Sequence, residues 1–135
     1  CDRDEAALGG LAGEPGVETV RANLEDGSPW PFGTRQFLGV VVTNYLHRPL
    51  FSSIASALSP GGVLIYETFS RQQAQIGKPS RDDFLLQPGE LLQRCSGLRV
   101  VAYEDGRLSD PERIIQRLCA VKEVSGAPTY PLQAR

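Results

Sequence analysis

The sequence has 135 residues, and 14 Lys and Arg against 16 Asp and Glu give a formal charge of −2. This length fits one domain, and 41% apolar with 22% charged residues is a composition typical of globular proteins. The mild charge excludes binding to nucleic acid through bulk basicity, and no apolar run approaches the roughly 20 residues of a membrane-spanning helix.

The cysteines and the single histidine limit the chemistry. Cys1, Cys95 and Cys119 are far apart and form no CxxC pair, so we expect the reduced thiols of a cytoplasmic protein. Because His47 is the only histidine, a site with several histidine ligands is excluded, and no metal is expected. Residues 1–15 lack the apolar core of a signal peptide.

The first third of the chain predicts a helix, a strand and a loop. Residues 3–12 have acids in their first turn and carry an apolar stripe of Ala and Leu, which favours a short helix. Residues 17–22 alternate apolar and polar side chains, as strands do. Residues 25–36 are rich in Gly and Pro and predict a loop, which Trp30 and Phe32 would fix to the body.

Two apolar strands flank one helix in the middle of the chain. Residues 37–44 and 62–69 are nearly continuous apolar runs, which predict strands buried on both faces. Residues 48–58 place apolar side chains on one helical face, and a Ser-Pro-Gly-Gly sequence at 59–62 ends that helix. A helix between two buried strands predicts a parallel pair with a right-handed crossover.

The last third predicts a long loop, a short helix and two strands. Residues 70–87 are polar, and loops of this length are more often functional or mobile than inert. Pro88 favours the start of a helix over 89–94. The next two apolar segments have no helix between them, so we expect an antiparallel hairpin of 98–104 with 114–124.

These elements together predict an α/β fold with a partial Rossmann-like sheet, in which parallel strands end in an antiparallel hairpin. The turn of the hairpin is expected over 105–113. Residues 125–135 show no pattern and are expected to form a loose tail.

Three short motifs follow predicted strands or begin the chain. They are Cys1-Asp2-Arg3-Asp4, Arg21-Ala22-Asn23-Leu24-Glu25 and Thr43-Asn44-Tyr45-Leu46-His47-Arg48-Pro49. Open α/β sheets bind ligands where strands end. With a parallel core that finishes in a hairpin, these motifs resemble the class I S-adenosylmethionine-dependent methyltransferases. The small bacterial proteins of the methyltransferase-domain or tellurite-resistance type are the most similar.

The resemblance covers residues 1–124 and implies S-adenosylmethionine as the cofactor. In the family, an acid that closes the second strand holds the ribose hydroxyls, because a carboxylate accepts two hydrogen bonds from a diol. This role falls to Asp2, beside Arg3. From the residues alone, Asp2 or Asp4 can instead cap the helix that follows.

The second and third motifs complete the expected cofactor site. In the family, a polar residue after the third strand contacts adenine and the next residue packs on the ring, which matches Asn23 and Leu24. Asp is commoner there, so Asn23 is a departure, and Asn23 can instead start a turn. Asn44, at the end of the family's fourth strand, is the remaining cofactor residue.

Three residues are assigned to the methyl acceptor, which we expect to be a small molecule. His47 would act as a base, since His titrates near neutrality, or it would be a helix-start residue that bonds backbone. Tyr45 and Glu67 would contact the substrate. Glu67 can instead pair with Arg71.

The glycine-rich loop of the family has no match in the sequence. Neither Gly9-Gly10 nor Gly61-Gly62 lies between a strand and a following helix. Because the chain starts at Cys1 and contains no Met, we expect a piece of a longer reading frame, with the loop and the first strand before Cys1. Such a piece would be inactive alone, and the unpaired edge of 37–44 predicts a homodimer.

Two other functions fit parts of the sequence. A nicotinamide-dependent oxidoreductase also uses an acid after its second strand, but the hairpin and the Asn-Tyr pair after the apolar run argue against it. A catalytically dead module that works by oligomerisation would explain the unmatched glycine-rich loop. No membrane or nucleic-acid partner is expected.

Overall fold

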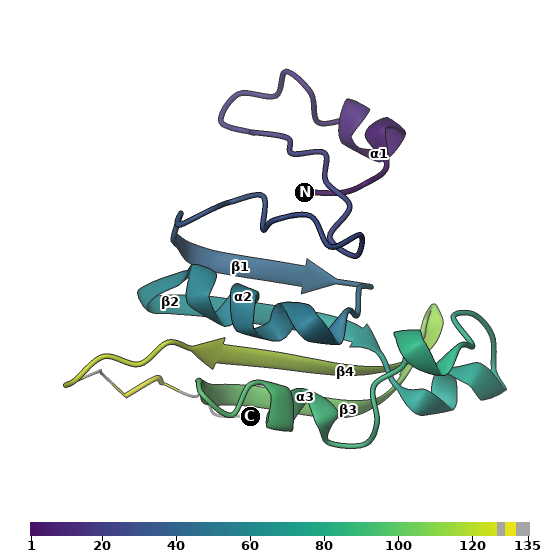
Figure 1. The fold of residues 1–135 in the computed structure, drawn as a ribbon. Helices are drawn as coiled ribbons and strands as arrows, with labels where there is room; N and C mark the ends of the chain where they lie inside the picture. Colours follow the sequence, from purple (N-terminus) through teal and green to yellow (C-terminus); the bar gives the residue numbers. More distant parts are fainter. Residues whose placement is uncertain (127–128, 132–135) are drawn as a thin grey trace. The chain divides into compact units, whose positions relative to one another are not determined.

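A computed structural model describes residues 1–126 and 129–131 and divides the chain into two compact units, 1–35 and 36–135 (Figure 1). Each unit is described by itself. Within the described residues, no helix is both long and apolar enough to cross a membrane.

The first unit contains one short helix, α1, over Glu5–Gly9. The carboxylate of Asp4 caps it by accepting hydrogen bonds from the backbone N–H groups of Ala6 and Ala7, at 2.9 and 3.3 Å. The helix predicted over 3–12 is therefore shorter than expected. The cap also shows that, of the two acids near the chain start, Asp4 is the one that caps the helix.

The strand predicted over 17–22 is wrong. The segment pairs with another part of the chain only through an isolated parallel bridge between Asp2 and Arg21. Asp2 N donates to Val20 O at 3.2 Å, and Ala22 N donates to Asp2 O at 3.0 Å. An alternating sequence needs a neighbouring strand to form a ladder, and here that neighbour contributes one residue.

The second unit is built on one four-stranded sheet, with the strands in the order β1-β2-β4-β3 (Figure 1). β1 pairs parallel with β2, and the β3–β4 hairpin joins the other side of β2 antiparallel. This confirms the predicted α/β fold with a parallel pair that ends in a hairpin. The strands are β1 Phe37–Thr43, β2 Leu58–Phe69, β3 Arg99–Ser109 and β4 Glu112–Val121.

The helix between the parallel strands is confirmed as a short 3₁₀ turn, η1 Arg48–Leu50, which continues into α2 Phe51–Ala57. The strand after it begins earlier than expected, because β2 includes the Ser-Pro-Gly-Gly sequence, with a register irregularity opposite the start of β1. Close packing of the backbone explains why glycine occupies position 62. A Cβ atom on it would lie 2.8 Å from Ser59 O and 3.0 Å from Phe37 O.

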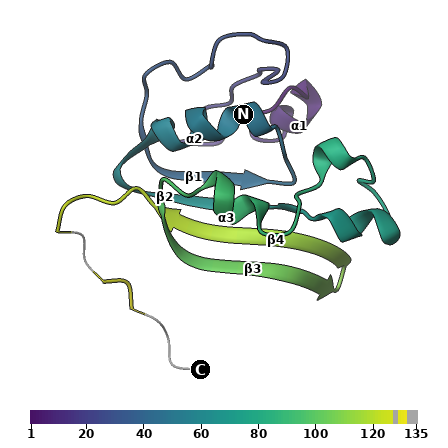
Figure 2. The same ribbon diagram turned by 60° about the horizontal axis from the view of Figure 1, so that its bottom comes forward.

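Both α-helices of the second unit, α2 and α3 Glu90–Arg94, lie on the same face of the sheet (Figure 2). The phenyl ring of Phe51 stacks on that of Tyr66, with centroids 5.3 Å apart. The residues buried on this side come from helices, strands and the loop after β2, and include Ile54, Ala57, Leu64, Tyr66, Leu85, Leu86, Leu91, Leu118 and Ala120.

The prediction that the parallel strands are buried on both faces is wrong for the described residues. Val41 and Ile65 point to the face opposite the helices and are 66% and 47% exposed. On the helix side of β1, Leu38 is 81% exposed. β1 is an edge strand, and in the second unit both α-helices cover a single face (Figure 2).

The hairpin is confirmed, but its strands are longer than predicted. Most of the expected turn over 105–113 is strand, and the chain reverses at Asp110-Pro111. Opposite charges pair across the extension, as in Arg107 with Glu112. The predicted loose tail lies partly outside the described residues, and within it the ring of Tyr130 lies 5.2 Å from the Arg99 guanidinium carbon.

Candidate functional site

The carboxyl end of β1 holds a residue in an uncommon backbone conformation. Asn44 has φ 52°, in the left-handed region that Asn tolerates better than most residues. Its N–H donates to Glu67 O at 2.9 Å, which fixes the chain as it leaves the sheet. The exposed Asn44 side chain therefore lies where β1 ends, beside the end of β2.

The next residues continue along this edge. The buried hydroxyl of Tyr66 donates to Tyr45 O at 2.8 Å, and burial raises the pKa of Tyr66, so this phenol stays a donor. His47 occupies the N-cap position of η1 without a side-chain cap hydrogen bond. His47 is thus a helix-start residue, as the alternative role expected: its backbone O accepts from Leu50 N at 3.0 Å, while its side chain makes no cap hydrogen bond.

Glu67 takes part in an ion-pair cluster on the sheet face opposite the helices. Its carboxylate lies 3.4 Å from Arg113 Nη1 and 3.8 Å from Arg117 Nη1, and Arg117 also pairs with Glu104. The alternative expected from the sequence, in which Glu67 pairs with Arg71, is wrong. Cross-strand register explains the difference, since Glu67 lies directly opposite Arg117.

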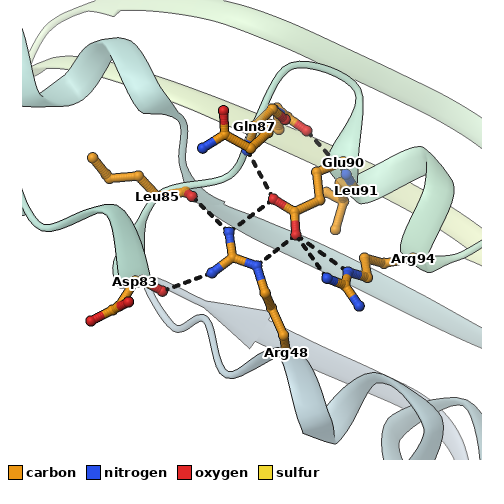
Figure 3. A network of polar contacts seen from close by, with 8 residues as sticks. Arg48, Asp83, Leu85, Gln87, Glu90, Leu91 and Arg94 are labelled. Carbon is orange, nitrogen blue, oxygen red and sulfur yellow. Dashed lines mark hydrogen bonds and ion pairs between the residues drawn. The ribbon is translucent and has the colours of Figure 1, made fainter.

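A second ion-pair cluster, not anticipated from the sequence, anchors the long loop after β2 (Figure 3). Arg48 Nε and Nη2 donate to the two Glu90 carboxylate oxygens at 2.7 and 2.9 Å. Arg48 also donates to Asp83 O and Leu85 O, at 3.1 and 3.0 Å. Hydrogen bonds from Arg48 are the main reason that the pKa of Glu90 falls to about 2.

Two buried glutamines fix the same loop, which contains two 3₁₀ turns, η2 Arg71–Gln75 and η3 Asp82–Phe84. Gln73 Oε1 accepts from Ile114 N at 2.8 Å, and Gln73 Nε2 donates to Lys78 O at 3.0 Å. Gln116 accepts from Leu91 N at 3.2 Å and donates to Gln87 O at 2.8 Å. The loop that was expected to be functional or mobile is thus held by hydrogen bonds, both within the loop and to β4, beside the carboxyl ends of the parallel strands.

The cofactor residues expected near the chain start lie in the first unit. Asp2 Oδ1 accepts from Asp4 N at 2.8 Å, and Asn23 Oδ1 accepts from Glu25 N at 3.0 Å. The turn-forming alternative for Asn23 is therefore present. The Asp2–Arg21 bridge brings the two motifs together, with Arg3 exposed and Leu24 half-buried.

The structure thus gathers the expected residues into two groups. The first unit holds Asp2, Arg3, Asn23 and Leu24, and the second holds Asn44, Tyr45, His47 and Glu67. Among residues 1–126 and 129–131, no group of three or more His, Cys, Asp or Glu side chains is placed to hold a metal ion. Sequence reasoning missed Arg48, Glu90 and the two buried glutamines because each has at least one partner that is distant along the chain.

Comparisons with known proteins address the fold. No protein-family model and no curated protein matches the chain. Among solved structures, a SAM-dependent methyltransferase from Methanosarcina mazei is similar, with TM-score 0.61 and 14% identity, over 92% of this chain and 81% of that one. A 16S rRNA (adenine(1408)-N(1))-methyltransferase variant with SAM from Catenulisporales acidiphilia has TM-score 0.43 and 15% identity, over 68% of this chain and 56% of that one.

The first of these likenesses agrees with the observed strand order. A parallel β1–β2 pair followed by the antiparallel β4 and β3 matches part of a methyltransferase sheet. The chain therefore has a partial Rossmann-like methyltransferase fold.

Proposed function

We propose that this chain binds S-adenosylmethionine and serves the transfer of its methyl group to a small-molecule acceptor. The observation that carries the proposal is the sheet, in which a parallel pair continues into an antiparallel hairpin, together with the similarity of this fold to the methyltransferase from Methanosarcina mazei. Fold alone does not fix function, so the polar residues expected to contact the cofactor must also fit it.

The residues of the first unit fit the adenosine part of the cofactor. Asp2 uses one carboxylate oxygen for Asp4 N, and its second oxygen can accept from a ribose hydroxyl. Asn23 uses its amide oxygen for Glu25 N, and its NH₂ group can donate to a ring nitrogen of adenine. Leu24 follows it and offers an apolar contact.

When bound, S-adenosylmethionine would supply an activated methyl group, which the acceptor atom attacks in line with the carbon–sulfur bond, so that the sulfur leaves as a neutral thioether. The protein then acts mainly by holding two reactants in line and excluding water. Asn44 would hold the cofactor at the end of β1, and Tyr45 and Glu67 would orient the acceptor. His47 would take the proton that the acceptor atom releases.

Equilibrium dialysis with labelled S-adenosylmethionine tests the proposal. We expect weak binding, because no glycine-rich turn between a strand and a following helix lies in the described residues. Asp2→Asn should weaken this binding about tenfold, since the amide keeps the bond to Asp4 N but removes the charge that favours the ribose hydroxyls.

The control is Glu14→Gln, an exposed acid of the same unit that has no assigned role. It should leave cofactor retention unchanged. Equal losses in the two variants would contradict the assignment of Asp2, and retention of nicotinamide adenine dinucleotide in preference to S-adenosylmethionine would favour the oxidoreductase alternative.

A further inference from the structure

We infer that the second unit has a separate binding site for a small apolar carboxylate in a groove between α2 and α3. The groove has a volume of about 410 Å³, within the range of roughly 300–1,000 Å³ that is usual for small-molecule sites. Both α2 and α3 contribute lining residues to the groove. The two helices lie on the same face of the sheet (Figure 2).

The floor of the groove is apolar. It is formed by buried side chains, of which Phe51 stacks on Tyr66, and Leu64 is 1% exposed. Cys95 also lines the groove, and burial raises the pKa of its thiol to about 11, so it contributes a neutral surface. An aliphatic or aromatic group would be removed from water on this floor.

One cation borders the groove from the end of β4. Lys122 Nζ donates to Leu58 O at 2.8 Å and to Ala55 O at 3.4 Å, two carbonyls at the end of α2. The main chain of Lys122 is also held, since Lys122 N donates to Gly62 O at 2.9 Å. An ammonium group has three donors, so one remains for an anion.

The second cation comes from α3. Arg94 Nη2 lies 3.3 Å from Glu90 Oε1 (Figure 3). The Arg94 guanidinium carbon is 5.9 Å from the centroid of the Phe51 ring. Arg48 already neutralises Glu90 through two shorter bonds. The cluster of two guanidinium groups and one carboxylate thus keeps a net positive charge beside the groove.

The charge pattern selects the ligand. The described residues that line the groove include two cations, Arg94 and Lys122, and no Asp or Glu. Ser52 and Ser56 add hydroxyl donors one helical turn apart on α2. An apolar floor with cations at its border favours a molecule that combines a hydrocarbon body with a carboxylate, and disfavours an amine.

Calorimetric or NMR titration of the 135-residue chain with octanoate tests this site. Octan-1-ol, which lacks the charge, and acetate, which lacks the hydrocarbon body, should each bind at least about tenfold more weakly. Equal binding of octanoate and octan-1-ol, or no saturable binding of octanoate, would overturn the inference.

Variants locate the site. Arg94→Gln and Lys122→Gln should each weaken octanoate binding about tenfold, whereas Arg107→Gln, a matched change at the far end of β3, should not. Ala55→Leu should block the groove without a change of charge. If Lys122→Gln does not fold, Arg94→Gln decides, because Arg48 and Glu90 remain paired in it. Equal effects of Arg94→Gln and Arg107→Gln would overturn the inference.

Discussion

Arg48 and Glu90, 42 residues apart in the sequence, form a two-point ion pair in which both carboxylate oxygens accept from one guanidinium. The pair joins the start of the η1–α2 helical segment to the first turn of α3 (Figure 3). Glu90 also accepts from Gln87 N at 2.9 Å, so its carboxylate fixes the end of the long loop as well. A single side chain therefore organises three segments beside the ends of the parallel strands.

Glu90→Gln should lower the free energy of unfolding by about 3 kcal/mol, because the Glu90 side chain is only 8% exposed and its loss leaves Arg48 without a counter-charge. Urea unfolding followed by circular dichroism measures this change. The control is Glu123→Gln, which breaks an exposed pair with Arg99 and should cost less than about 1 kcal/mol. Similar losses in both variants would contradict the importance given to the buried pair.

Acid should remove the same stabilisation. The pKa of Glu90 falls from the ordinary 4.5 to about 2 in the folded chain, because Arg48 binds the charged form. A lowered folded-state pKa stabilises the protein above the unfolded value, and this stability is lost as the pH falls through the folded value. The difference in unfolding free energy between the natural chain and Glu90→Gln should therefore shrink between about pH 4.5 and pH 2. A difference that is constant over this window would contradict the shift.

Gly62→Ala should destabilise the chain by about 1–3 kcal/mol, because the new Cβ would meet backbone oxygens of Ser59 and Phe37, which cannot move independently. Gly106→Ala in β3 is the control, since a Cβ there has nothing within 4 Å. Its effect should stay within about 0.5 kcal/mol. Thermal unfolding of the two variants compares them, and equal melting temperatures would show that the tight fit at Gly62 is unimportant.

The β1 edge leads us to expect self-association. β1 has no strand on its outer side within residues 1–126 and 129–131, and it carries the exposed Leu38 and Val41 with no charge or Pro in 37–43. Pairing with a second copy would satisfy the edge and bury these side chains. Sedimentation at micromolar concentration should show a dimer that Leu38→Lys weakens, whereas a 14.7 kDa monomer would contradict it.

Local patterns predicted the core of the second unit well. Continuous apolar runs specified the paired strands β1 and β2, and an apolar helical face specified α2, because burial imposes these patterns on neighbouring residues. The residues at the ends of parallel strands were predictable for a related reason, since such ends share one edge of the sheet. Thus Asn44 and Glu67 lie side by side.

Long-range partners were not predictable from local patterns. Nothing around Arg48 identifies Glu90, and nothing around Glu67 distinguishes Arg71 from Arg113, because cross-strand register decides which charges meet. The polar end of the hairpin was missed because cross-strand charge pairs, rather than apolar alternation, hold it. The segment 17–22 has the alternation of a strand but only one bridge to a neighbour.

The most direct test of the proposed function is a backbone NMR titration of the chain with S-adenosylmethionine, which detects weak binding and locates it. We expect saturable shift changes at Asp2, Asn23, Leu24 and Asn44, and a smaller response in Asp2→Asn. Shift changes confined to the α2–α3 groove, or none at the highest soluble cofactor concentration, would contradict the proposal that these residues hold the cofactor.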